Sequence, residues 1–112
     1  MLRKDQRLKK KKDFDLVFKK GSGFKESFLI LKFLPSHSGK NRFGIVVAQK
    51  VSKKAVARNK IKRRLRALIR AAEPQFKKRV DAVIVTLPGT EKKDWQEIKK
   101  AIDKLFQKAK II

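Results

Sequence analysis

The chain has 112 residues, of which 33 are Lys or Arg and 10 are Asp or Glu, so its formal net charge is +23. Hydrophobic residues make up 41% of it, which is enough for one ordinary domain with a core and excludes a disordered basic tail. The absence of cysteine excludes disulfides, thiolate nucleophiles and cysteine metal sites, and the charge predicts a polyanionic partner.

Membrane and export signals are missing from the sequence. No apolar run approaches the roughly 20 residues that a membrane-spanning helix needs. The basic arm at residues 1–12 is not followed by the long apolar segment and small-residue cleavage site of a signal peptide. We therefore expect a cytoplasmic protein, with no membrane partner and a basic arm at 1–12 before the folded part.

The first predicted element is a short helix over residues 13–20. Phe14, Val17 and Phe18 have the i, i+3, i+4 spacing of one helix face, and Gly21 is placed to end the helix. The GSG at 21–23 lacks the further glycine and the strand-to-helix context of a phosphate loop, so we interpret it as a helix stop.

Two strands are predicted next, at residues 27–34 and 42–50. Pro35 and the turn-forming SHSGKN separate them, which favours an antiparallel hairpin. Gly44 and Ala48 make one face of the second strand shallow near Val46, as would suit a groove or a closely packed helix.

The stretch ARNKIKRRLRALIR at residues 57–70 predicts a helix that ends at Glu73-Pro74. With Ile61 at 0° on a helical wheel, the apolar residues fall between about −40° and +80°: Ala57, Leu65, Leu68, Ile69 and Ala72. A cationic flank with a single amide lies between about 100° and 200°: Lys62, Arg66, Asn59, Arg70 and Arg63, with Arg58 at the boundary. Lys60 and Arg64 lie on the other flank, so the helix has a core side and an anion-binding side.

A third strand at 80–88 and a final helix complete the chain. Trp95, Ile98, Ile102, Leu105 and Ala109 have helical spacing, and Asp94 and Glu97 occupy the positions of a capping box. The order α-β-β-α-β-α predicts an α+β fold, a two-layer sandwich of a mixed sheet with helices on one face. Residues 1–112 are expected to form a single domain.

Residues for independent catalysis are lacking. His37 lies in a loop between two strands, where a histidine is far more often solvated than catalytic. Asp13 and Asp15 are two residues apart and so do not share a helix face. We expect no catalytic residue, no metal site and no cofactor on the protein.

Nucleic-acid binding is the favoured function, against the alternative that the charges only form a solvated surface. Within the basic helix, arginine predominates over lysine from Arg63 onward. Guanidinium groups suit phosphates and base edges because they donate two parallel hydrogen bonds.

The same residues carry a family resemblance. ARNKIKRRLRALIR resembles the arginine-rich helix of the bacterial ribonuclease P protein component, with the pattern Arg-Asn-x-Ile-Lys-Arg-x-x-Arg. The matching residues are Arg58, Asn59, Ile61, Lys62, Arg63 and Arg66. Three further segments resemble that family in the same order: KDFDLVFKKG, RFGIVVAQKVSKKAVARN and DAVIVTLPG. The resemblance therefore covers nearly the whole chain.

The resemblance implies both a fold and a role. The fold would be like domain 2 of ribosomal protein S5, with a left-handed βαβ crossover around the arginine-rich helix. The role would be that of the accessory subunit of an endoribonuclease, in which the ribonuclease P RNA with its Mg²⁺ removes the 5′ leader of precursor tRNA. A ribosomal-type structural RNA-binding protein is the alternative.

The resemblance also implies the site. The residues expected to bind RNA are Lys50, Lys53, Lys54, Arg58, Asn59, Lys62, Arg63, Arg66 and Arg70. Phe14 and Phe18 would line a cleft for the single-stranded leader, although their spacing alone favours core residues that seat a short helix.

Overall fold

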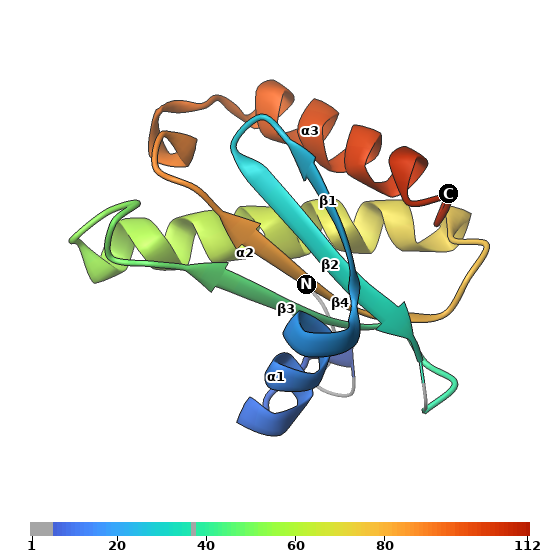
Figure 1. Ribbon diagram of the computed structural model, residues 1–112. Helices are drawn as coiled ribbons and strands as arrows, with labels where there is room; N and C mark the ends of the chain where they lie inside the picture. The colour runs from blue at the N-terminus through green and yellow to red at the C-terminus, as the bar shows by residue number, and fades with distance from the viewer. Residues whose placement is uncertain (1–5, 37) are drawn as a thin grey trace.

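The computed structural model describes residues 6–36 and 38–112. Its helices are α1 (Lys11–Lys20), α2 (Ala55–Ala72) and α3 (Trp95–Lys108), and its strands are β1 (Ser22–Glu26), β2 (Leu29–Pro35), β3 (Arg42–Val47) and β4 (Val80–Thr86) (Figure 1). Two short 3₁₀ turns, η2 (Glu73–Gln75) and η3 (Thr90–Lys92), flank β4. The α+β class is confirmed, but β1 was missed because its sequence, SGFKE, lacks the apolar alternation of a typical strand.

The sheet has the order β1-β2-β4-β3, and it is mixed as predicted. β1 pairs antiparallel with β2, β2 pairs antiparallel with β4, and β3 pairs parallel with β4. The predicted hairpin between residues 27–34 and 42–50 is therefore wrong, because β4 lies between these strands. β4 takes the inner position because its residues are almost all buried, which requires cover on both faces.

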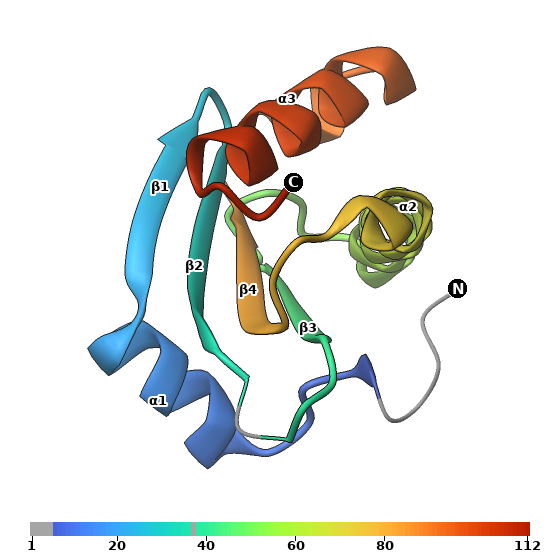
Figure 2. The same ribbon diagram turned by 90° about the vertical axis from the view of Figure 1, so that its right-hand side faces the viewer.

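The connection from β3 through α2 to β4 is left-handed, as the resemblance implied. In Figure 1 both strands point to the left, β4 lies above β3, and α2 passes behind the sheet, as Figure 2 confirms from the side. Most crossovers between parallel strands are right-handed, so general chirality would have predicted the opposite connection.

The helices cover both faces of the sheet. α2 and α3 lie on one face and α1 on the other (Figure 2), so the expectation that all helices share one face is wrong for α1. The main core fills the space between the sheet and the pair α2 and α3, and includes Leu31, Phe43, Ile84, Leu65 and Leu105. On the opposite face, Leu8 and Val17 form a smaller cluster with Val83 of β4.

Two glycines fix how closely α1 approaches the sheet. A Cβ atom on Gly44 would lie 2.4 Å from Cε1 of Phe14, so the missing side chain makes room for the phenylalanine ring. This confirms the close helix packing that the shallow strand suggested. A Cβ atom on Gly21 would lie 2.3 Å from the carbonyl oxygen of Val17, and Gly21 therefore ends α1 as predicted, although its φ of −74° is not left-handed.

A partly buried group of charges ties α1 to the two parallel strands. Arg42 of β3 donates two hydrogen bonds to the carboxylate of Asp81 in β4, at 2.9 Å from Nε and 2.7 Å from Nη2. Its Nη1 also lies 3.7 Å from the carboxylate of Asp13 in α1. The hydrogen bonds to Asp81 raise the pKa of Arg42 above its ordinary value. They also give the buried Asp81 carboxylate the hydrogen-bond donors that it needs.

The final helix begins as the sequence predicted. Asp94 accepts a hydrogen bond from the backbone N–H of Glu97, and Glu97 accepts one from the N–H of Asp94, which completes the capping box. None of the helices in the described part of the chain is long and apolar enough to cross a membrane.

Replacing Gly44 by Ala is expected to lower the free energy of unfolding by about 1–3 kcal/mol, because the new methyl group overlaps the ring of Phe14. Chemical denaturation measures the loss. In a Phe14→Ala background the same change should cost much less, since the overlapping ring is gone.

Gly23→Ala is the matched control for this prediction. A Cβ atom there would meet only the Lys32 side chain, at 3.6 Å, which is an ordinary contact. A Gly44→Ala variant as stable as Gly23→Ala would show that Phe14 does not pack on β3 as described.

Candidate nucleic-acid interface

The surface of α2 divides into a buried face and a charged one, as its sequence predicted. Ile61, Leu65, Leu68, Ile69 and Ala72 are buried against the sheet and α3. The flank that carries Asn59, Lys62, Arg63, Arg66 and Arg70 is exposed or half-buried. The packing of the apolar face therefore holds these groups in one row on the surface.

α2 itself carries many basic residues and no acidic ones. The sequence from Ser27 to Ala72 contains no Asp or Glu, and the first turn of α2 has no acidic residue. Lys54, at the N-cap, supplies no side-chain hydrogen bond to the helix. The free amides and the helix dipole add positive potential to this end, where an anion would be stabilised.

The predicted RNA-binding residues before α2 differ in how they are held. Lys50, Lys53 and Lys54 are exposed on the loop that leads into the helix. Arg58 is half-buried, and its Nη1 donates a 2.9 Å hydrogen bond to the carbonyl oxygen of Ser52. Arg58 thus folds this loop back onto the first turn of α2, a structural task that its sequence position did not reveal.

A pocket of about 260 Å³ joins the N-terminal segment, α1, β3 and α2. Its lining includes Arg7, Phe14, Gly44 and Arg66, so it brings a predicted RNA-binding arginine to a predicted cleft residue. Burial is the main cause that lowers the pKa of Arg66 below its ordinary value, and the positive charge of Arg7 lowers it further. Two guanidinium groups that face one hollow favour an anion between them.

Arg7 is the site residue that the sequence analysis missed. It forms an isolated parallel bridge with Phe43, and the N–H of the next residue, Leu8, donates to the carbonyl oxygen of Phe43 at 2.9 Å. Its buried Nε has no hydrogen-bond partner in the described structure. Arg7 lies within the run of basic residues in the arm, where no periodicity distinguishes it from its neighbours.

Phe14 and Phe18 differ in exposure, and Val17 between them is buried. Phe14 is half-buried over Gly44, so it serves the packing of α1 while one side of its ring lines the pocket. The Phe18 side chain is 37% exposed, and Nζ of Lys32 lies 6.0 Å from its ring centroid. The structure therefore leaves an open aromatic ring beside a cation on this face of the molecule.

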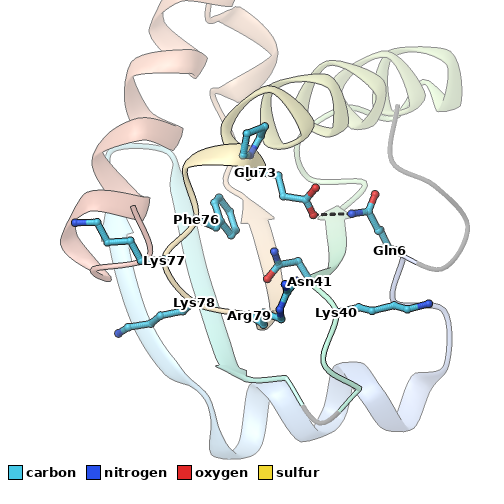
Figure 3. A pocket seen from close by; sticks show the side chains of 9 residues that line it. Gln6, Lys40, Asn41, Glu73, Phe76, Lys77, Lys78 and Arg79 are labelled. Carbon is cyan, nitrogen blue, oxygen red and sulfur yellow. Dashed lines mark hydrogen bonds between the residues drawn. The ribbon is translucent and has the colours of Figure 1, made fainter.

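A larger hollow of about 560 Å³ lies at the C-terminal end of α2 (Figure 3). Lys77, Lys78 and Arg79 surround it, and Gln6 donates a hydrogen bond to Glu73 across it. Its aromatic member, Phe76, stacks edge-to-face on Phe43 and Phe106 and so belongs to the core. The lining of the hollow is therefore polar and mostly basic, with Glu73 as its acidic member.

A third, shallow depression of about 310 Å³ lies on the other flank of α2, where Lys60, Arg63, Arg64 and Ala67 meet Trp95 of α3. His37, for which no catalytic role is expected, lies outside the described residues. Within the described residues, no three His, Cys, Asp or Glu side chains are grouped as a metal site would require.

Comparison with known proteins gives a family along almost the whole chain. The family model described as "Ribonuclease P" matches residues 2–110. The ribonuclease P protein component of Synechocystis sp. is 39% identical over 112 residues, which cover 99% of this chain and 90% of the relative. That of Dictyoglomus turgidum is 34% identical over 111 residues, covering 97% and 92%.

Solved structures share the fold. The RNase P protein of Thermotoga maritima is 27% identical and superimposes with a TM-score of 0.82 over 91% of this chain and 96% of that one. A Staphylococcus aureus RNase P protein mutant with defective mRNA degradation activity is 24% identical, with a TM-score of 0.89 over 97% and 92%. From the family match, the identity to the relatives and the shared fold, it follows that this chain belongs to the bacterial ribonuclease P protein family.

Proposed function

We propose that this chain is the protein subunit of a ribonuclease P ribonucleoprotein, in which it binds the catalytic RNA and the 5′ leader of precursor tRNA. In that role it assists the endonucleolytic cut that gives the mature 5′ end of the tRNA. Membership of a tRNA-processing family supports the proposal. The observation that carries it is the acid-free cationic surface of α2 beside the pocket of Arg7, Phe14 and Arg66.

The cationic surface suits RNA because phosphates neutralise charges that repel one another in the free protein. Lys62, Arg63 and Asn59 have no ion pair or side-chain hydrogen bond within the described part of the chain, so their donors remain available. Contacts of this kind release counterions and position the RNA, which is how a protein without acid–base groups can raise the rate of a reaction.

The chemistry of the cut is assigned to the RNA, and the protein alone is proposed to be non-catalytic. We propose that the Mg²⁺ needed for hydrolysis is held by the RNA, since the described side chains offer no group of ligands for it. The chain's own residues bind, orient and neutralise. The cytoplasm is the proposed location.

The leader is proposed to run along the face that carries α1. The open ring of Phe18 and the pocket side of Phe14 offer stacking surfaces for bases of a single strand. Lys50, Lys53 and Lys54 offer charges for its phosphates from the loop before α2. A ribosomal-type role is not favoured, because the family match extends over the strands and the last helix as well as the basic helix.

Reconstitution with a bacterial ribonuclease P RNA and precursor tRNA tests the whole proposal. The protein should increase cleavage at the leader junction at low Mg²⁺, and should cleave nothing when the RNA is omitted. His37→Ala should process precursor tRNA at the rate of the unaltered protein. A hundredfold fall, the scale on which a general acid or base acts, would move the chemistry to the protein.

The salt dependence of RNA binding tests the cationic flank. Changing Lys62, Arg63 or Arg66 to Ala should each reduce the slope of log K against log salt by about 0.7–0.9, the value of one lost phosphate contact. Nitrocellulose filter binding across a salt series measures the slope.

Lys100→Ala is the matched control for the flank. Lys100 is an exposed residue of α3, not of the basic helix, and forms no ion pair in the described structure. If Lys100→Ala reduces the slope by the same amount, the RNA is attracted only by the net charge of the protein. If the slope is unchanged in the α2 variants, their side chains do not contact the RNA.

Phe18→Ala is expected to weaken binding of precursor tRNA to the holoenzyme by about five- to 150-fold, which equals the about 1–3 kcal/mol of one stacked base. Binding of mature tRNA, which lacks the leader, should not change. Leu16→Ala is the control, because Leu16 is 36% exposed on the same helix but has no aromatic ring on which a base could stack. Equal weakening for both RNAs, with a lower melting temperature, would return Phe18 to a packing role.

A further inference from the structure

Trp95 is the large aromatic side chain whose environment departs furthest from its sequence pattern. Its spacing with Ile98 and Ile102 places it on the apolar side of α3, yet it is 40% exposed while those two residues are buried. It lies in the first turn of α3, beside Lys60, Arg63 and Arg64 of α2. The exposed part of the indole is therefore available for contact with a partner.

The depression beside Trp95 has the composition of a site for a nucleotide. Lys60, Arg63 and Arg64 bring three cations to its edge, and Ala67 provides a small floor beside the ring. Val56, one turn before Lys60 on the same side of α2, is 79% exposed and extends the apolar surface. A nucleotide base can stack on the aromatic ring, and the phosphate of that nucleotide can pair with the surrounding cations.

The groups at this depression are not engaged elsewhere. Within the described residues, neither the indole N–H of Trp95 nor the charged ends of Lys60, Arg63 and Arg64 have a hydrogen-bond or ion-pair partner. The neighbouring carboxylates are already committed, because Asp94 and Glu97 cap α3 and Glu97 also pairs with Lys93 at 3.7 Å. The site therefore attracts an anion without first having to break an internal contact.

The place of the depression separates it from the leader cleft. Lys60 and Arg64 lie on the flank of α2 opposite to that of Arg66, and Arg66 lines the pocket that also contains Phe14. α1, with Phe14 and Phe18, lies on the other face of the sheet from α3 (Figure 2). A single strand that runs along α1 would have to pass around α2 to reach Trp95.

We propose that Trp95, Lys60 and Arg64 form a second RNA-binding site, which takes an unpaired nucleotide of the catalytic RNA. The base stacks on the exposed indole, and the adjoining phosphates pair with the two cations. This inference rests on the proposed function, because it assigns a further contact between the protein and the same RNA.

The fluorescence of the protein tests the proposal directly, because the chain has one Trp and no Tyr. The unaltered protein is titrated with a bacterial ribonuclease P RNA, while filter binding follows complex formation independently. Stacking should quench the emission of Trp95 in step with binding, and precursor tRNA alone should not reproduce the effect. Binding without a change in emission would overturn the Trp95 site but leave the proposed function intact.

Variants show whether the contact contributes to affinity. Trp95→Ala should raise the Kd for the ribonuclease P RNA by about five- to 150-fold, the fold change that corresponds to one stacked base, and Trp95→Phe should recover most of it. Lys60→Ala should weaken binding more than Lys100→Ala does. Circular dichroism and the melting temperature verify that each variant is folded.

Three results would count against the second site. An unchanged Kd in Trp95→Ala, even with quenching in the unaltered protein, would show that the indole lies near the RNA without contributing. Quenching by precursor tRNA but not by the ribonuclease P RNA would assign the site to the substrate and overturn the proposal. The absence of any RNA binding in the filter assay would overturn the proposed function together with this inference.

Discussion

The structure depends on the burial of one face of α2, because its other side is unfavourable in isolation. Cations at i,i+4 positions cost about 0.2–0.5 kcal/mol per pair, and the helix has neither an acidic first turn nor an N-cap hydrogen bond to offset them. Ile61, Leu65, Leu68 and Ile69 are buried, and each such side chain contributes about 1.5–3 kcal/mol. Packing against the sheet and α3 therefore keeps this segment helical, although the repulsion between its charges opposes the helix.

The distribution of the few acidic residues follows from the same constraint. Asp81 is buried beneath Arg42, and Glu26 pairs with Lys104 and Lys108 across β1 and α3. The hydrogen bond from Lys108 lowers the pKa of Glu26 below its ordinary value. Carboxylates thus stabilise the contacts of the sheet with α1 and α3, while α2 is left without them. A polyanion that binds α2 stabilises the folded state by mass action, because it relieves repulsion that the fold itself leaves in place.

Local patterns in the sequence predicted the elements well, and the pairing of strands poorly. The structure confirms three local predictions: the apolar arc of α2, the capping box at Asp94 and Glu97, and the helix stop at Gly21. Each of these features depends on residues within one or two helical turns. The partner of β3 is β4, across the whole of α2, and no local signal specifies that choice. Handedness came only from the family resemblance. Arg7 and Trp95 escaped notice because their sites form between elements that are distant in sequence.

The position of α2 at the rim of the sheet explains how one basic helix can serve two surfaces. A helix buried on one arc of about 120° leaves the rest of its circumference to solvent, and here cations occupy both flanks of that remainder. The flank of Arg66 adjoins α1 through the pocket with Phe14, whereas the flank of Lys60 and Arg64 adjoins α3 through Trp95. Each flank thus pairs its cations with an aromatic ring from a different layer. In the proposed assignment, the leader lies on the side of α1 and the second site on the side of α3, so the two contacts use different aromatic rings on the two flanks of α2.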